Sequence, residues 1–191
     1  MTDSIDYAAI EHECGLVLAP KRDLVAVRGK GALLYDEAGR EYIDCVAGIG
    51  VASLGHAHPA VVSAIQSQAE TLITCPHILY NDVRSKMLKK LVEVTPENLS
   101  RAYLCNSGAE AVEAALKFAR LNTGRPNFVT AMRGFHGRTM GAVSATFTPK
   151  YREAFEPLVP GFSYVPFNKI DKLDAAIDDK TAAVMLELVQ G

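Results

Sequence analysis

The chain has 191 residues, of which 49% are hydrophobic and 22% charged, enough for one good core and a smaller additional part. Its formal net charge of −2 offers no basic footprint for nucleic acid or an anionic membrane, so neither is expected as a partner. The start is acidic, and no apolar run is long enough to span a bilayer. The sequence therefore predicts a cytoplasmic protein.

The first 47 residues differ in texture from the rest. A short amphipathic helix is expected around residues 4–13. Further on, apolar runs alternate with Gly-Lys-Gly and Asp-Glu-Ala-Gly-Arg, a pattern typical of antiparallel strands joined by turns. We expect residues 1–47 to be the N-terminal segment of a small domain and residues 48–191 the first part of a larger one.

From residue 48 onward, predicted helices alternate with predicted strands. The expected helices cover 59–72, 82–94, 107–122 and 169–178. The expected strands cover 101–105, 127–131, 162–167 and 181–188. The alternation predicts an α/β fold with a mostly parallel sheet and helices on both faces. Because the last strand runs almost to Gly191 with no closing helix, we expect a truncated chain.

A polar corner, Asn-Ser-Gly, joins the strand 101–105 to the helix that follows. Ser107 and Glu110 have the spacing of a capping box, and Glu113 and Lys117 that of an i,i+4 ion pair. Helix capping alone explains the serine and the first glutamate, but it leaves Gly108 unexplained. Free amides and a hydroxyl at a helix N-terminus suit a phosphate, so the corner is a candidate phosphate site.

The segment RGFHGRTMG, residues 133–141, follows a predicted strand at the same edge of the sheet. One interpretation is a surface loop whose Phe135 fills a local core. In the other, the aromatic ring lies on a flat heterocycle while Arg138 binds a carboxylate. A phosphate, a flat ring and a carboxylate together describe pyridoxal phosphate (PLP) and an amino acid.

Other ligands fit less well. Ser53 stands where a dinucleotide fingerprint needs its third glycine, and no ATP-binding P-loop occurs. His56 and His58 have no acidic or sulfur partner nearby in sequence, so no metal site is expected. The four scattered cysteines are expected to be small buried residues.

Several motifs occur together in order: KGALLYDEAGREYIDC, SLGHAHP, NSGAEAVEAALKFAR, GFHGRT and LELVQG. This combination resembles the class III PLP-dependent aminotransferases, nearest to the acetylornithine aminotransferases and related enzymes of lysine biosynthesis. The resemblance implies the fold type I architecture and a homodimer at full length. It also implies transfer of an amino group from an amino-acid donor, first choice N-acetylornithine, to 2-oxoglutarate in arginine or lysine biosynthesis.

The resemblance also assigns roles to individual residues. Those expected at the cofactor are Ser107, Gly108, Ala109, Phe135 and His136. The first three would hold the phosphate, the phenyl ring would stack on the pyridine, and the histidine would lie beside it. Arg138 would bind the substrate carboxylate. Glu187 matches the first acid of the family's EPxQGE stretch, although Leu188 replaces the proline.

None of the ten lysines has the sequence context of the family's Schiff-base lysine. That lysine and the aspartate that pairs with the pyridine nitrogen are expected beyond Gly191, so the chain contains no catalytic residue and is expected to be inactive by itself. Three alternatives stay open: another ω-amino acid transaminase acting on 4-aminobutyrate or ornithine, a phosphate-binding α/β enzyme without PLP, and a non-catalytic interaction scaffold.

Overall fold

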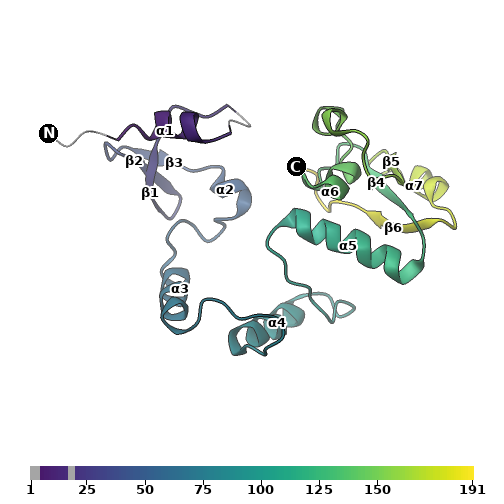
Figure 1. Ribbon diagram of the computed structural model, residues 1–191, viewed down its shortest axis with the longest axis horizontal. Helices are drawn as coiled ribbons and strands as arrows, with labels where there is room; N and C mark the ends of the chain where they lie inside the picture. The colour runs from purple at the N-terminus through teal and green to yellow at the C-terminus, as the bar shows by residue number, and fades with distance from the viewer. Residues whose placement is uncertain (1–4, 17–19) are drawn as a thin grey trace. The chain divides into compact units, whose positions relative to one another are not determined.

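The computed structural model describes residues 5–16 and 20–191, and the chain divides into two compact units, residues 1–81 and 82–191. Figure 1 colours the first unit purple to blue and the second teal to yellow. The predicted boundary between residues 47 and 48 concerns the domains of the whole protein and stays a prediction.

The first unit begins with helix α1 (Tyr7–Cys14), where Asp6 Oδ1 accepts a hydrogen bond from the Ala9 amide. Its antiparallel sheet has the order β1-β2-β3. The strands are β1 (Ala26–Lys30), β2 (Leu33–Asp36) and β3 (Glu41–Ile43). The predicted helix and antiparallel strands are therefore confirmed, except that residue 4 lies outside the described residues.

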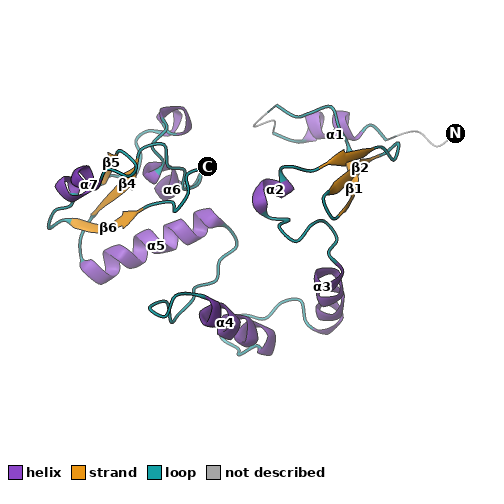
Figure 2. Ribbon diagram, turned by 180° about the vertical axis from the view of Figure 1, so that it is seen from behind, coloured by secondary structure: helices purple, strands orange, loops and turns teal. Residues whose placement is uncertain are grey.

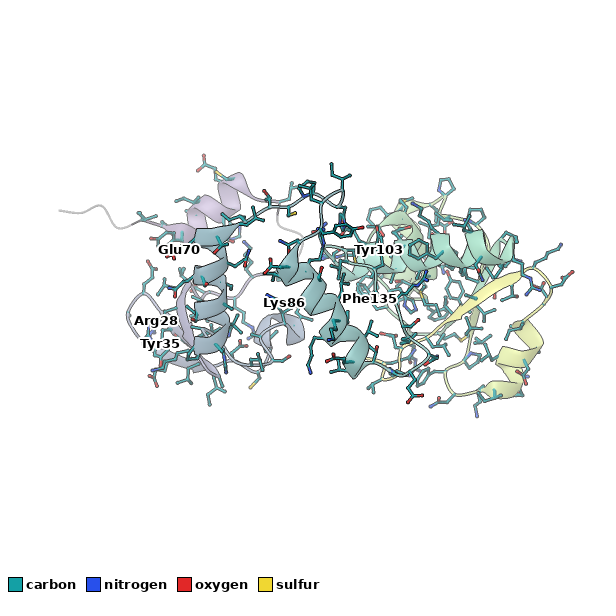
Figure 3. The ribbon with its side chains drawn as sticks, turned by 90° about the horizontal axis from the view of Figure 1, so that it is seen from below. Arg28, Tyr35, Glu70, Lys86, Tyr103 and Phe135 are labelled. Carbon is teal, nitrogen blue, oxygen red and sulfur yellow. The ribbon has the colours of Figure 1, made fainter. Side chains whose placement is uncertain are left out.

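Side-chain contacts hold the turns of this sheet. The Arg28 guanidinium lies 3.5 Å from the centroid of the Tyr35 ring on the neighbouring strand (Figure 3). The Asp36 carboxylate accepts hydrogen bonds from the Arg40 amide, the Arg40 guanidinium and the Tyr42 hydroxyl. Desolvation acts to raise the pKa of Asp36, but these hydrogen bonds outweigh it and lower the pKa below its ordinary value.

The segment after β3 contains α2 (Ala47–Gly50) and α3 (Pro59–Thr71). His56 Nε2 lies 2.6 Å from Asp44 Oδ2, so this histidine has an acidic partner twelve residues away. This acid is not a neighbour in sequence; the chain folds back here, and His56 also pairs with Gly31 in an isolated bridge. The hydrogen bond from His56, together with two backbone amides, lowers the pKa of Asp44 below its ordinary value.

The second unit contains a parallel sheet with the order β5-β4-β6. Its strands are β4 (Asn127–Ala131), β5 (Phe162–Val165) and β6 (Thr181–Met185). Its α-helices are α4 (Asp82–Val94), α5 (Gly108–Thr123), α6 (Met140–Ala145) and α7 (Ile170–Ala176), and the short 3₁₀ turns are η1 (Pro149–Tyr151) and η2 (Glu153–Phe155). Helix α5 packs against β6 and α6, and α7 packs against β5 (Figure 2).

The core of this unit is built around the central strand β4, whose residues from Phe128 to Ala131 are all buried. The Phe128 ring stacks on Phe162 of β5 with centroids 5.3 Å apart. Burial of such a continuous run is typical of a central parallel strand. Helix α5 contributes Leu116 to the core and ends at Gly124, whose φ of 69° is left-handed.

Three local expectations were wrong. Residues 101–105 form no strand, because within the described chain no strand pairs with them; Tyr103 instead packs edge-on against Phe118. Helix α6 was missed, because MGAVSA is short and has no amphipathic period. Three of the four cysteines, Cys14, Cys45 and Cys105, are exposed. The fourth, Cys75, is half-buried, so the chain's cysteines are not the buried core residues that the sequence suggested.

Candidate functional site

The polar corner before α5 is a capping box. Ser107 is the N-cap in extended conformation, and its Oγ accepts a hydrogen bond from the Glu110 amide at 3.1 Å. The Glu110 carboxylate reaches back to the Asn106 amide, one residue further than a capping box usually spans. The predicted capping by Ser107 is therefore confirmed. The side chain of Glu110 points toward the residues that precede the helix.

The first turn of α5 carries two unused donors. Within residues 5–16 and 20–191, the amides of Gly108 and Ala109 have no hydrogen-bond acceptor. A Cβ atom at Gly108 would meet no protein atom within 4 Å, so this side of the first turn is open. Free amides, the Ser107 hydroxyl and the positive end of a 16-residue helix fit an anion such as a phosphate.

The glycine-rich loop 132–139 lies directly against this corner. Gly137 has a φ of 133°, and a Cβ atom there would lie 3.0 Å from the Ala109 Cβ and 2.9 Å from the Ala142 Cβ. The distance to Ala142 is shorter than real Cβ contacts, and the positive φ disfavours any side chain, so this packing requires glycine. The structure therefore brings the two segments that the sequence singled out into contact at the first turn of α5.

Phe135 is 47% exposed and does not fill a local core. Its ring meets Tyr151 edge-on, with centroids 5.7 Å apart and an interplanar angle of 75°. Its amide donates a hydrogen bond to Glu187 Oε2 at 3.3 Å. About half of the Phe135 surface is therefore accessible, while its backbone is held by Glu187, which follows β6; Figure 3 labels Phe135.

His136 is held by its own amide, which donates to Thr146 Oγ1 at 3.0 Å. Its Nε2 atom is buried and has no hydrogen-bond partner in the described structure. Burial lowers the pKa of His136 below its ordinary value, and the negative charge of Glu187 opposes that shift. An unpaired buried nitrogen is costly, so this atom is a candidate contact for a ligand.

Arg138 is exposed, and no acid pairs with it in the part of the chain that the structure describes. It is therefore free to bind an incoming carboxylate.

Glu187 is half-buried and anchors the loop at Phe135. Gln190, which sequence reasoning did not select, donates from Nε2 to the Met132 carbonyl at 3.0 Å. The segment after β6 thus holds the start of the loop at two points.

Glu113 was assigned to an ion pair with Lys117, and that assignment was wrong. Its carboxylate instead accepts hydrogen bonds from the Thr139 hydroxyl and from the amides of Gly141 and Ala142. The reason is that α6 presents unpaired amides to it, and backbone donors compete well with a solvated lysine. No sequence pattern marks this contact, since it joins residues 26 to 29 positions apart.

All ten lysines are exposed. None has the desolvated setting in which a lysine becomes a covalent catalyst. Within the described residues, no group of three or more His, Cys, Asp and Glu side chains could hold a metal ion. None of the helices described is long and apolar enough to cross a membrane.

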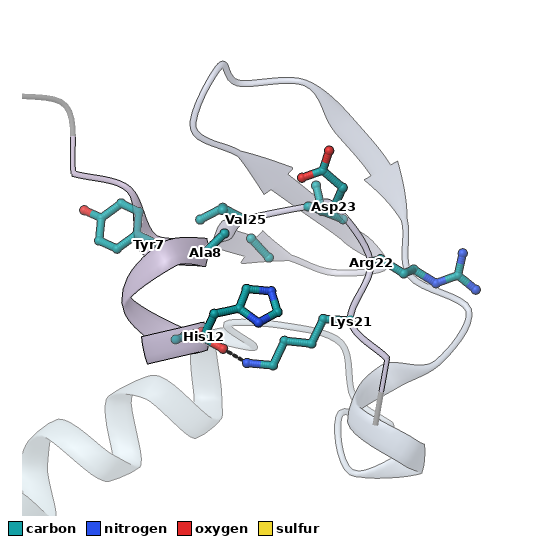
Figure 4. Close-up of a pocket in the computed structure, with 10 residues that line it drawn as sticks. Tyr7, Ala8, His12, Lys21, Arg22, Asp23 and Val25 are labelled. Atoms are coloured by element: carbon teal, nitrogen blue, oxygen red, sulfur yellow. Dashed lines mark hydrogen bonds and ion pairs between the residues drawn. The ribbon is translucent and has the colours of Figure 1, made fainter. Parts of the chain in front are cut away.

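A hollow of about 440 Å³ lies in the first unit, between α1 and residues 21–26 (Figure 4). The Lys21 side chain pairs with Glu11 at its side. None of the predicted site residues lines it. Its lining gives no indication of a ligand class.

The parallel sheet, the open helix corner and the aromatic loop define an α/β protein with a candidate phosphate site beside a candidate site for a planar ring. The chain belongs to the class III aminotransferases: it matches the family described as "Aminotransferase class-III" over residues 18–191. It is 52% identical over 165 residues to acetylornithine aminotransferase of Methanopyrus kandleri, covering 86% of this chain and 42% of that protein. It is 53% identical over 173 residues to LysW-aminoadipate semialdehyde transaminase of Deinococcus radiodurans, covering 90% of this chain and 40% of that protein.

Solved structures agree with this family. Ornithine aminotransferase from Toxoplasma gondii superposes with a TM-score of 0.90 at 31% identity, covering 97% of this chain and 46% of that one. A taurine:2-oxoglutarate aminotransferase from Bifidobacterium kashiwanohense, solved with PLP and glutamate, gives a TM-score of 0.87 at 25% identity, covering 96% of this chain and 48% of that one. The predicted fold class is confirmed. The chain spans less than half the length of these relatives.

Proposed function

We propose that the protein containing this chain is a PLP-dependent aminotransferase, and that residues 105–139 form part of its cofactor site. The observation that supports this most is the contact of Gly137 with Ala109. It places a loop with an available aromatic face and a free arginine against a helix corner with two free amides. One unit of the chain therefore holds groups suited to a phosphate, to a flat ring and to a substrate carboxylate, the three features of PLP and an amino acid.

Each residue of the site has a distinct proposed task. The amides of Gly108 and Ala109 and the Ser107 hydroxyl donate to the phosphate. The ring of Phe135 stacks on the pyridine ring and excludes water from one face of the pyridine. The buried Nε2 of His136 lies beside the pyridine and gains a polar partner there. Arg138 orients the substrate by its carboxylate. When bound, PLP supplies the electron sink that lets an amino group leave one carbon and join another.

We further propose that the amino donor is N-acetylornithine and the acceptor 2-oxoglutarate, in arginine biosynthesis. Relatives with the same level of identity act, by their names, on acetylornithine and on a LysW-linked aminoadipate semialdehyde. A carrier-linked lysine precursor is therefore the second candidate donor, supported by an identity of 53%. A semialdehyde carries an aldehyde in place of the terminal amino group, so in this second case the donor would be the aminated form of that compound and the semialdehyde its product. By family resemblance, we expect a homodimer.

The test uses the protein expressed from its complete gene. We expect purified protein to bind PLP with a visible absorbance change, and to transfer the amino group of N-acetylornithine to 2-oxoglutarate faster than that of ornithine or 4-aminobutyrate. Preference for the LysW-linked donor would change the proposed pathway from arginine biosynthesis to lysine biosynthesis. Protein that stays colourless with PLP and binds a nucleotide instead would overturn the proposal.

A further inference from the structure

A single carboxylate joins the two halves of the proposed cofactor site. Glu113 lies on α5, and its Oε1 atom accepts three hydrogen bonds from the segment that ends the glycine-rich loop. The donors are the Thr139 hydroxyl at 2.6 Å, the Gly141 amide at 2.8 Å and the Ala142 amide at 3.2 Å. Two of these are first-turn amides of α6, which have no partner inside their own helix.

The space for this carboxylate depends on a glycine. A Cβ atom at Gly141 would collide with Glu113 Oε2 and lie 2.8 Å from its Oε1. The φ of Gly141 is not in the left-handed region, so its backbone suits any residue. A Cβ atom at Gly141 would therefore require the Glu113 carboxylate to move, which would disturb its three hydrogen bonds.

Glu113 is well placed to hold the loop firmly. Its side chain is half-buried, and no cation pairs with it in the described part of the chain. Hydrogen bonds from amides to a charged carboxylate are stronger than those between neutral groups, and negative charge is favoured at a helix N-terminus. The loop between Phe135 and Thr139 is therefore fixed at its start by Glu187 and at its end by Glu113.

We propose that Glu113 is a positioning residue. By holding the end of the glycine-rich loop, it fixes the position of Phe135 and Arg138 relative to the candidate phosphate site at the N-terminus of α5. This proposal depends on the proposed function of the two segments as one cofactor site. Glu113 touches neither cofactor nor substrate. Its effect passes through the end of the loop, since the same helix carries both Ala109 and Glu113 one turn apart.

Hydrogen exchange and ligand binding would test the proposal in the protein expressed from its complete gene. The variants are Glu113→Ala, the conservative Glu113→Gln, and Lys117→Ala as a control on an exposed residue one turn further along α5. We expect Glu113→Ala to speed amide exchange across residues 133–145 and to weaken PLP binding roughly tenfold, with Glu113→Gln between it and the wild type. We expect the control to change neither quantity. The KM for the carboxylate substrate should rise more than kcat falls, which simple loss of stability would not produce.

A double-mutant cycle tests the contact without any cofactor. We expect Gly141→Ala to lower the melting temperature of the apoprotein clearly when Glu113 is present, and much less in the Glu113→Ala background, where the colliding carboxylate is gone. An equal loss in both backgrounds would overturn the proposed role of Glu113, even if PLP binds normally. Coupling in the cycle together with no PLP binding by the wild type would refute the proposed function, and with it the cofactor role of Glu113.

Discussion

Gly137 lies against Ala109 so closely that a Cβ atom added to the glycine would be 3.0 Å from the Cβ of the alanine. The two residues are 28 positions apart and belong to the two segments that the sequence marks as chemically unusual. Their contact turns two separate motifs into one candidate site within the unit of residues 82–191.

Gly137→Ala should destabilise the protein by about 2–4 kcal/mol, through a strained positive φ and through overpacking against two alanines. Gly124→Ala is the matched control, because Gly124 also has a positive φ but has open space around its Cβ position. We expect the control to cost about 1 kcal/mol, from strain alone. Chemical denaturation would measure the free energy of unfolding of both variants. Equal losses would show that the contact with Ala109 does not contribute to stability.

Gly108→Val should weaken PLP binding, because its branched side chain would fill the open side of the first turn next to the free amides. Gly108→Ala controls for backbone effects: it adds a Cβ that meets no protein atom and should keep or raise the stability of the helix by up to about 1 kcal/mol. Titration of the apoprotein with PLP measures the effect. Unchanged cofactor affinity in the valine variant would mean that the corner serves only as a helix cap.

Arg138→Ala should raise the KM for the carboxylate substrate roughly 10- to 100-fold, the worth of a hydrogen-bonded charge pair. PLP affinity should stay near that of the wild type, because the guanidinium is not assigned to the phosphate. Steady-state kinetics and PLP titration separate the two. An equal loss of substrate and cofactor binding would contradict the assignment.

The pair of Asp44 and His56 predicts an acid-dependent contribution to the stability of the first unit. The pKa of Asp44 is lowered in the folded chain, so its charge stabilises the fold above the ordinary carboxyl value of 3.8, and this stabilisation is lost as the pH falls through the lower folded value. Asp44→Asn should therefore speed amide exchange around residues 44–56 at pH 7, and the difference from the wild type should vanish in stronger acid. Glu37→Gln, at an exposed position, is the control. A difference that persists unchanged in acid would contradict the role of the charge.

Much of the local structure could be predicted because the forces that produce it act over a few residues. The capping box of Ser107 and Glu110 spans three positions, and its hydrogen bond forms as predicted. Helix α4 (Asp82–Val94) and strand β4 (Asn127–Ala131) match their predicted ranges. Amphipathic spacing and a continuous apolar run are properties of the chain itself, so reading them requires no knowledge of the neighbours.

The expected strand at 101–105, the contacts of Glu113 and those of His56 all depend on partners that are distant in sequence. Residues 101–105 have an apolar strand composition, but a strand also requires a neighbour to pair with. Glu113 has an ideally spaced lysine on its own helix, yet it binds amides 28 and 29 positions away. His56 finds its acid twelve positions back, where a turn returns the chain.

The amino-acid sequence by itself determined the alternation of helices and strands, the capped corner before α5, and the residue types of the candidate phosphate and ring site. Only the tertiary structure decided that Gly137 meets Ala109, that Glu113 caps α6, and that Glu187 holds Phe135. The physical reason is that capping and periodicity are local, whereas the close packing of a loop on a helix depends on where the sheet places both.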